Sequence, residues 1–238
     1  MNTMQFGEGA NSAFASDWAL EQLYQGILSR KLSPEMRLTE AALSEWAGVS
    51  RTPLRDALQR LEMAGIVSRQ RNRSIRINPL STDEMERLSM LREVLEGLLV
   101  RRVAMRSSRG EISLERLEAI ISEMSAVDRD KGTELLLRLG REFHRELSRL
   151  AGDPMASRMA EQVLLSLERY RHLVDRLEDR SNEILAEHKA IIDAIRSGDE
   201  KAAERLMHEH LANARAAYAK RLAAGTDIQL EEGPRDTP

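Results

Sequence analysis

The chain has 238 residues and a formal net charge of −3, with 42% hydrophobic residues and only 3% aromatic residues. No stretch is apolar for long enough to cross a bilayer, and the first residues, MNTMQFGEGANS, have neither the basic nor the apolar region of a signal peptide. The absence of cysteine excludes disulfides, thiolate nucleophiles and cysteine-ligated metals. We therefore expect a cytoplasmic, mainly α protein with no membrane partner, made of one large or two smaller domains.

The amino-terminal part predicts two short helices. Residues 1–15 are small and polar, and we expect them to be disordered. The first helix then has an apolar stripe made of Leu20, Leu23, Tyr24, Ile27 and Leu28. The stretch LTEAALSEWAGVS predicts the second helix, which ends at Gly48 and has one apolar face, formed by Leu43, Trp46 and Ala47.

A third helix is predicted within VSRTPLRDALQRLEMAGIV, residues 49–67. Thr52 and Pro53 are typical of a helix start, and Gly65 is typical of a helix end. Helical spacing places apolar and polar side chains on opposite faces: Leu54, Leu58 and Leu61 on one, and Arg51, Arg55, Gln59 and Glu62 on the other. Arginines in front of an apolar face suit a helix that enters a DNA major groove.

The surroundings of this helix favour the same interpretation. The tight stretch Gly48-Val49-Ser50 joins the two helices into a helix-turn-helix. IVSRQ and SIRIN predict two short strands around Arg71-Asn72-Arg73, which would form a basic wing. Residues 41–78 carry seven arginines against three acidic residues, a local charge of +4 that suits phosphate contact. The alternative is an ordinary helical hairpin with solvated arginines.

Residues 18–78 resemble the winged-helix domain of the GntR family of bacterial transcription regulators, with SRTPLRDALQRLE as the most diagnostic stretch. In that family, arginines near the start of the recognition helix contact DNA. The resemblance implies that Arg51 and Arg55 contact DNA here. We expect the DNA-contacting set to include Ser50 and Thr52 beside them and Arg71 and Arg73 in the wing. The family's wing has a glycine at its tip, whereas this chain has RQRNRS.

The remainder predicts helix after helix. A capping box, Ser81-Thr82-Asp83-Glu84, begins the first of these. The expected helices are 82–108, 113–130, 133–151, 154–176, 180–197 and 200–223. Short connections favour an antiparallel bundle of about six helices. The expected organisation is thus a winged helix-turn-helix over 16–78, a helical domain over 79–223 and a flexible tail over 224–238.

Three of the five histidines fall on apolar helical faces and are predicted to point into the bundle: His144, His188 and His210. His172 and His208 have charged neighbours at helical spacing and are predicted to point outward. Convergent imidazoles are natural ligands for zinc, nickel or a similar divalent metal. The alternative is that each is a hydrogen-bonded core residue, since neutral imidazoles are costly to bury without partners.

Residues 81–223 resemble the ligand-sensing FCD domain of the FadR branch of the GntR family, through LREVLEGLLVRRVA, EFHRELSRLAGDP and EHKAIIDAIRSGDEKAAERLMHEHL. Many members bind a divalent metal with one Asp and three His, the Asp lying four residues before the first His. The resemblance makes the same three histidines metal ligands, but the Asp position is Gly140. The metal would then depend on water or an anionic effector, or the histidines would bind an acid directly.

Arg92 lies on an apolar stripe with Leu88, Leu95 and Leu99, an unusual place for a permanent charge. One interpretation is a snorkelling side chain paired with Glu96. The other is a fork for a ligand carboxylate, because an arginine on this helix of the resembled family often faces the effector pocket.

The sequence thus predicts a homodimeric transcription regulator on a palindromic double-stranded DNA operator, and the resemblance implies that it is a repressor. A small organic acid would bind at Arg92, His144, His188 and His210 and release the protein from its operator. Two alternatives remain: a metal-dependent hydrolase or lyase using the three histidines, which would need a nearby base that their stripes lack, and a DNA-binding protein with a purely structural bundle.

Overall fold

The computed structural model of the chain describes residues 10–33, 36, 38–71, 74–127, 133–171 and 181–223. They form two compact units whose boundary in the sequence lies between Leu80 and Ser81. We call the first the winged unit and the second the helical unit. The expected tail, 224–238, lies outside the described residues, as do residues 1–9. None of the described helices combines the length and the apolar character needed to span a membrane.

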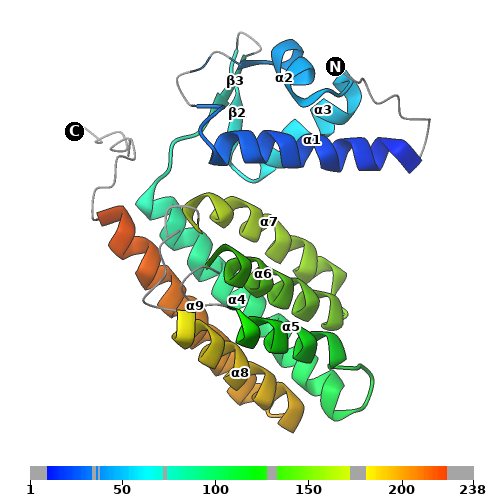
Figure 1. Ribbon diagram of the computed structural model, residues 1–238, viewed down its shortest axis with the longest axis vertical. Helices are drawn as coiled ribbons and strands as arrows, with labels where there is room; N and C mark the ends of the chain where they lie inside the picture. The colour runs from blue at the N-terminus through cyan, green and yellow to red at the C-terminus, as the bar shows by residue number, and fades with distance from the viewer. Residues whose placement is uncertain are drawn as a thin grey trace. The chain divides into compact units, whose positions relative to one another are not determined.

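Within its described residues, the winged unit contains three helices and a small antiparallel sheet (Figure 1). Its helices are α1 (Ala10–Leu28), α2 (Glu40–Ala47) and α3 (Arg51–Met63). Its strands are β1 (Leu38–Thr39), β2 (Val67–Arg69) and β3 (Ser74–Ile77), in the order β1-β3-β2. This arrangement confirms the predicted helix-turn-helix with a wing.

Helix α1 starts earlier than the sequence suggested. It begins at Ala10, so it occupies part of the range 1–15 that we expected to be disordered. Ala15 and Ser16 are buried, and Arg60 of α3 donates a hydrogen bond to Asp17 at 2.5 Å. Helix α1 packs on α3, and this packing extends the helix through small residues that have little apolar periodicity.

The caps of α2 and α3 set the turn between them. Thr39 accepts a hydrogen bond from the backbone N–H of Ala42 at 3.2 Å and so caps α2. Gly48 ends α2 with φ +67°, a left-handed conformation that glycine adopts without steric cost. Ser50 is the N-cap of α3 and makes no side-chain capping bond. The predicted capping position of Thr52 is therefore wrong, since Thr52 lies inside the first turn of α3, whereas Pro53 lies in the first turn as predicted.

The core of the winged unit follows the predicted stripes. The α3 leucines are fully buried: Leu54, Leu58 and Leu61. On α2, Leu43 and Ala47 are buried, but Trp46 is 42% exposed although we placed it on the same face. Its ring instead lies across α1 at Gly26, where an added Cβ would stand 2.6 Å from the ring.

Strands β2 and β3 confirm the predicted wing strands, with Val67 opposite Ile77 and Arg69 opposite Ile75. Strand β1 was not predicted. It has two residues, and Leu38 pairs with Ile75. Two residues are too few to show the alternation by which a strand is recognised in a sequence. Tertiary pairing with β3 alone defines it.

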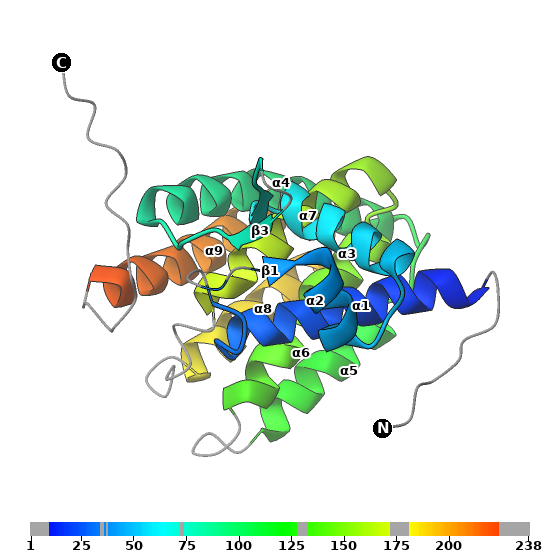
Figure 2. The same cartoon turned by 90° about the horizontal axis from the view of Figure 1, so that it is seen from above.

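The helical unit has six helices within the described residues, as expected (Figures 1 and 2). They are α4 (Thr82–Ser108), α5 (Glu115–Ala126), α6 (Thr133–Leu150), α7 (Pro154–Arg171), α8 (Ser181–Ser197) and α9 (Glu200–Ala223). Ser81 caps α4 through the backbone N–H of Glu84, at 3.3 Å. Helix α4 contacts α6, α7, α8 and α9 and is the central element of the unit.

Candidate functional site

The start of α3 presents the predicted DNA-contacting residues to solvent. The side chains on this surface are all exposed: Ser50, Arg51, Thr52 and Arg55. Arg71, in the turn between β2 and β3, is exposed as well. Arg73, the other wing arginine, lies outside the described residues. The exposed arginines are supported from behind by the buried leucine face of α3, which makes the surface rigid.

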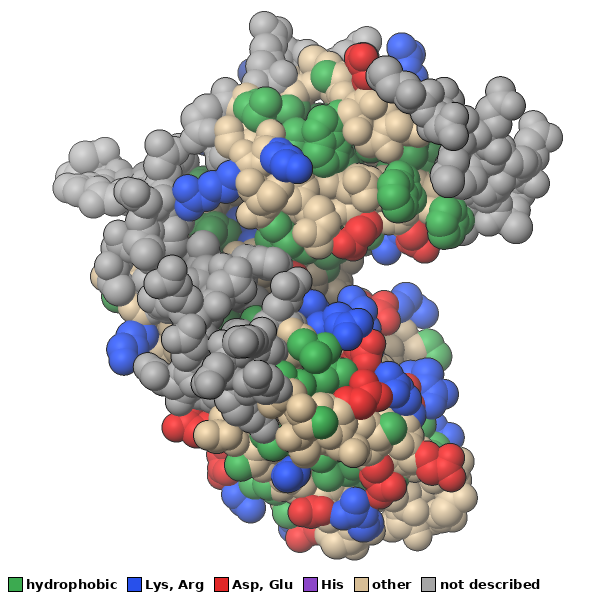
Figure 3. Space-filling model, in the orientation of Figure 1, with side chains coloured by type: hydrophobic (Ala, Val, Ile, Leu, Met, Phe, Trp, Pro, Cys, Tyr) green, Lys and Arg blue, Asp and Glu red, His purple; other side chains and the backbone are tan. Residues whose placement is uncertain are grey.

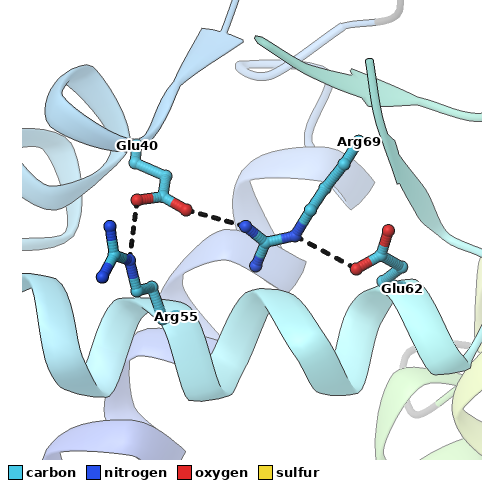
Figure 4. Close-up of polar contacts among 4 residues, drawn as sticks. All are labelled: Glu40, Arg55, Glu62 and Arg69. Carbon is cyan, nitrogen blue, oxygen red and sulfur yellow. Dashed lines mark hydrogen bonds and ion pairs between the residues drawn. The ribbon is translucent and has the colours of Figure 1, made fainter. Parts of the chain in front are cut away.

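A cluster of two arginines and two glutamates joins α2, α3 and β2 (Figure 4). Arg55 donates from Nε to Glu40 Oε2 at 2.9 Å. Arg69 donates from Nη1 to Glu40 Oε1 at 2.8 Å and from Nε to Glu62 Oε2 at 3.1 Å. The hydrogen bond from Arg55, helped by Arg69, lowers the pKa of Glu40 and keeps it ionised. No local pattern identifies Glu40 or Arg69 as functional, because their contact joins residues 29 apart in the chain.

The three predicted histidines converge in the helical unit. His144 of α6, His188 of α8 and His210 of α9 are buried, and one ligand nitrogen from each lies within 4.8 Å of the others. The Nε2 atoms of His144 and His210 are 3.3 Å apart. Phe143 packs edge-on against the His188 ring, with centroids 4.8 Å apart. We call these three residues the histidine cluster.

Each ring of the histidine cluster is oriented by an acceptor at Nδ1. His188 Nδ1 lies 2.7 Å from the backbone oxygen of Ile184, and His210 Nδ1 lies 2.7 Å from Glu187 Oε2. His144 Nδ1 contacts the carboxylate of Glu96. A carbonyl or carboxylate oxygen can only accept, so each Nδ1 carries the proton and each Nε2 presents a lone pair.

Burial keeps two members of the cluster, His144 and His210, neutral. It lowers the pKa of His144 to about 4 and that of His210 to about 4, despite the raising effect of Glu96 and Glu187. Two neutral nitrogens whose lone pairs face each other at 3.3 Å repel, so a cation between them would stabilise the arrangement. Two imidazoles on a tetrahedral zinc ion stand roughly 3.4 Å apart, given Zn–N distances of about 2.0–2.1 Å. The donor set therefore fits a divalent metal.

Arg92 is buried beside this cluster. It is 4% exposed and donates from Nε to Glu96 Oε1 at 2.5 Å. Burial opposes the charge of Arg92, but Glu96 outweighs it and raises the pKa. Burial would likewise raise the pKa of Glu96, yet Arg92 and His144 hold it well below its usual range. The predicted pair with Glu96 is confirmed, but Arg92 does not snorkel to solvent, since both side chains lie inside the unit.

A cleft opens onto the histidine cluster and Arg92, with about 510 Å³ of empty space, part of it open to solvent. Its remaining lining mixes small, apolar and polar side chains: Leu136, Leu137, Gly140, Ile184, Glu187, Ala214, Ala217 and Tyr218. A Cβ added at Gly140 would lie 3.9 Å from His188 Nε2, so position 140 faces the cluster.

The other two histidines, His172 and His208, were both predicted to point outward. His172 lies outside the described residues. For His208 the prediction is wrong: the residue is half-buried, and its Nε2 is buried against α4 at Gly97, where there is no side chain. The charged neighbours of His208 in its own helix indicated solvent, but the missing side chain at Gly97 leaves space for the imidazole ring.

Two acidic residues at the histidine cluster were also missed. We expected no carboxylate near the histidines, yet Glu96 and Glu187 contact His144 and His210. Glu96 comes from α4, and Glu187 lies in α8 across from α9, so neither shares an apolar stripe with the histidine it contacts. Both carboxylates meet Nδ1 atoms, so among the described residues no acidic group joins the three histidines as a further ligand.

Comparisons with known proteins match each unit to a family model. Residues 16–77 match the family described as bacterial regulatory proteins, gntR family, and residues 87–213 match the FCD domain. The transcriptional repressor RspR of Escherichia coli K12 is 25% identical over 189 residues, covering 79% of this chain and 82% of RspR. The repressor NanR of Citrobacter rodentium is 27% identical over 224 residues, covering 85% of each chain.

Solved structures share the fold. E. coli McbR/YncC has a TM-score of 0.70 at 18% identity and covers 89% of this chain and 98% of its own. A putative GntR transcriptional regulator from Rhodococcus sp. RHA1 has a TM-score of 0.66 at 20% identity, with 89% and 99% covered. The homologues are transcriptional regulators, so the hydrolase or lyase alternative does not hold.

Proposed function

This chain belongs to the GntR family of bacterial regulatory proteins and carries an FCD domain, and we propose that it is a repressor released from its operator by a small organic acid. The observation that carries the proposal is the convergence of three Nε2 atoms and Arg92 on one cleft. Relatives named repressors support the direction of regulation. DNA binding is the activity of the winged unit.

The DNA contacts are proposed to centre on the start of α3. Arg51 and Arg55 would address guanine edges or phosphates in the major groove, and Ser50 and Thr52 would bond to phosphates. Arg71 and Arg73 would reach the backbone or minor groove from the wing. Exposure of the described members of this set supports the proposal.

In the cleft, His144, His188 and His210 would hold a divalent cation such as zinc or nickel through Nε2. Bound there, the cation would act as a Lewis acid that attracts an effector carboxylate. Arg92 adds a fixed positive charge, and its Nε bond to Glu96 leaves the terminal nitrogens for a second acceptor. Gly140 puts no side chain between the cluster and the cleft. These features favour an anionic ligand.

We also propose that the protein is a homodimer on a palindromic operator, since two-fold proteins match two-fold DNA sites. Helix α4 carries an exposed apolar stripe on the side away from its buried face, made of Met90, Leu91, Val94 and Leu98. Such a stripe is costly in water and suits contact with a second copy. Val94→Glu should then yield monomers in sedimentation analysis, whereas an unchanged mass would oppose this surface.

The test begins by selecting a preferred duplex from a random library with the full chain. Small organic acids, including sugar acids and dicarboxylates, are then screened by thermal shift with zinc present. An acid that raises Tm should weaken duplex binding about 5–150-fold, the range of ordinary allosteric coupling. If no acid raises Tm, the purely structural bundle is the better account. If an acid raises Tm without affecting the duplex, the regulatory proposal fails.

A further inference from the structure

We propose that Glu40 is a specificity-determining positioning residue: it holds Arg55 so that this arginine reads a base end-on instead of contacting the nearest phosphate. The inference rests on the proposed role of α3 in reading DNA. It adds a residue that touches no DNA itself and acts through the arginine beside it.

The contacts of Glu40 reach three elements. It is the first residue of α2, and its two carboxylate oxygens each receive one arginine: Oε2 binds Arg55 of α3, and Oε1 binds Arg69 of β2 (Figure 4). Arg69 is held from its other side by Glu62. Glu40 is therefore fixed from two directions, and its side chain is only 22% exposed. A carboxylate held in this way restricts the orientation of Arg55.

The contact constrains which edge of Arg55 is available. Glu40 binds Nε, and within the described residues the two Nη groups make no hydrogen bond. A carboxylate at Nε lies along one edge of the planar guanidinium and leaves the outer edge, Nη1 and Nη2, for another acceptor. That outer fork matches guanine O6 and N7 in the major groove. Arg55 is 62% exposed, so the fork is accessible to DNA.

The charges of the two arginines and two glutamates around Glu40 also favour specific over general DNA binding. Two carboxylates offset two arginines, so the cluster adds little to the sequence-independent attraction between protein and phosphates. Without Glu40, Arg55 would be a mobile cation that any phosphate can bind. The expected signature is tighter binding to arbitrary DNA together with weaker discrimination.

The control is a matched loss of charge on the same helix. Glu45 is exposed on α2 and makes no ion pair within the part of the chain that the structure describes. Glu45→Gln therefore removes one negative charge from the winged unit without touching Arg55. Exposed ion pairs add little to folding stability, so Glu40→Gln should also fold, and circular dichroism checks this.

The experiment measures Kd for the library-selected duplex and for a shuffled duplex of equal composition at near-cellular salt. Glu45→Gln should tighten both and leave their ratio unchanged. Glu40→Gln should lower the ratio about tenfold, as expected when one bidentate base contact is lost. In an Arg55→Ala background, Glu40→Gln should lower the ratio no further.

Three outcomes are decisive. If Glu40→Gln behaves like Glu45→Gln, Glu40 contributes charge alone and the inference is overturned. If the effects of Glu40→Gln and Arg55→Ala on the ratio multiply, Glu40 does not act through Arg55, and the inference is overturned as well. If the unaltered chain selects no preferred duplex, it is the proposed function that fails, so the two failures are distinguishable.

Discussion

Each unit contains an arginine held by a glutamate, but the two pairs have opposite surroundings. In the winged unit, Arg55 and Glu40 are 62% and 22% exposed; in the helical unit, Arg92 and Glu96 are each 5% exposed. A pair with an exposed arginine contributes about 0–1 kcal/mol to stability. The outer edge of Arg55 stays accessible to DNA while Glu40 holds Nε. Removing one member of a buried pair typically costs about 3–5 kcal/mol, because the other charge remains uncompensated. The exposed pair suits recognition, and the buried pair suits a permanent scaffold.

The helical unit arranges its charges differently on its surface and in its interior. Acidic and basic side chains are interspersed over the face of the helical unit seen in Figure 3, and many of its surface arginines pair with acidic neighbours, such as Arg116 with Glu142 at 3.0 Å. The buried polar groups, by contrast, form a chain from Arg92 through Glu96 to the neutral His144. That chain connects the cleft to the central helix α4.

The largest expected effect comes from breaking the buried pair of Arg92 and Glu96. Glu96→Gln leaves the charge of Arg92 buried and uncompensated, and should lower the free energy of unfolding by about 3–5 kcal/mol. Glu40→Gln is the matched change in the exposed pair and should cost no more than about 1 kcal/mol. Urea denaturation of both variants measures the contrast. Equal losses in the two variants would show that burial does not distinguish the pairs.

A second test removes a member of the histidine cluster. His188→Ala should weaken zinc binding by more than the roughly 10–100-fold that follows loss of an outer-shell partner, because a direct ligand disappears. His208→Ala is the control, since His208 lies in the same unit with its Nε2 against Gly97. Calorimetric titration of the metal-stripped protein measures both. Equal zinc affinity in the two variants would remove the cluster from consideration as a metal site.

The smallest effect concerns a buried hydroxyl. Burial raises the pKa of Tyr170 to about 12, and its hydroxyl donates to Glu84 at 2.8 Å. In the unfolded chain the tyrosine hydroxyl loses its proton near pH 10. The contribution of Tyr170 to the free energy of unfolding is therefore fully present below pH 10 and is lost as the pH rises toward 12. At pH 11 the loss should be about 1 kcal/mol. Tyr170→Phe should lack this pH-dependent loss of unfolding free energy. Denaturation of both proteins at pH 8 and pH 11 measures the difference.

Helical periodicity predicted most of the fold. The stripes of α3 and the predicted positions of α4 to α9 agree with the structure to within a few residues, apart from α5, which is shorter at both ends. The predicted helix 154–176 extends past α7, and its last residues, 172–176, lie outside the described residues. These elements could be predicted because apolar spacing and turn residues are local signals. Strand β1 and the start of α1 could not, since pairing with β3 and packing on α3 define them.

What the sequence determined by itself was the set of inward-facing side chains, including Arg92 and the histidine cluster, because a helix buries one face and periodicity identifies it. What only the tertiary structure decided was which groups meet across helices and strands. Glu96 and Glu187 at the imidazoles, Glu40 between two arginines and His208 against Gly97 all depend on how separate elements pack. The physical reason is that spacing along one helix fixes a direction, whereas a contact also requires the position of the second element.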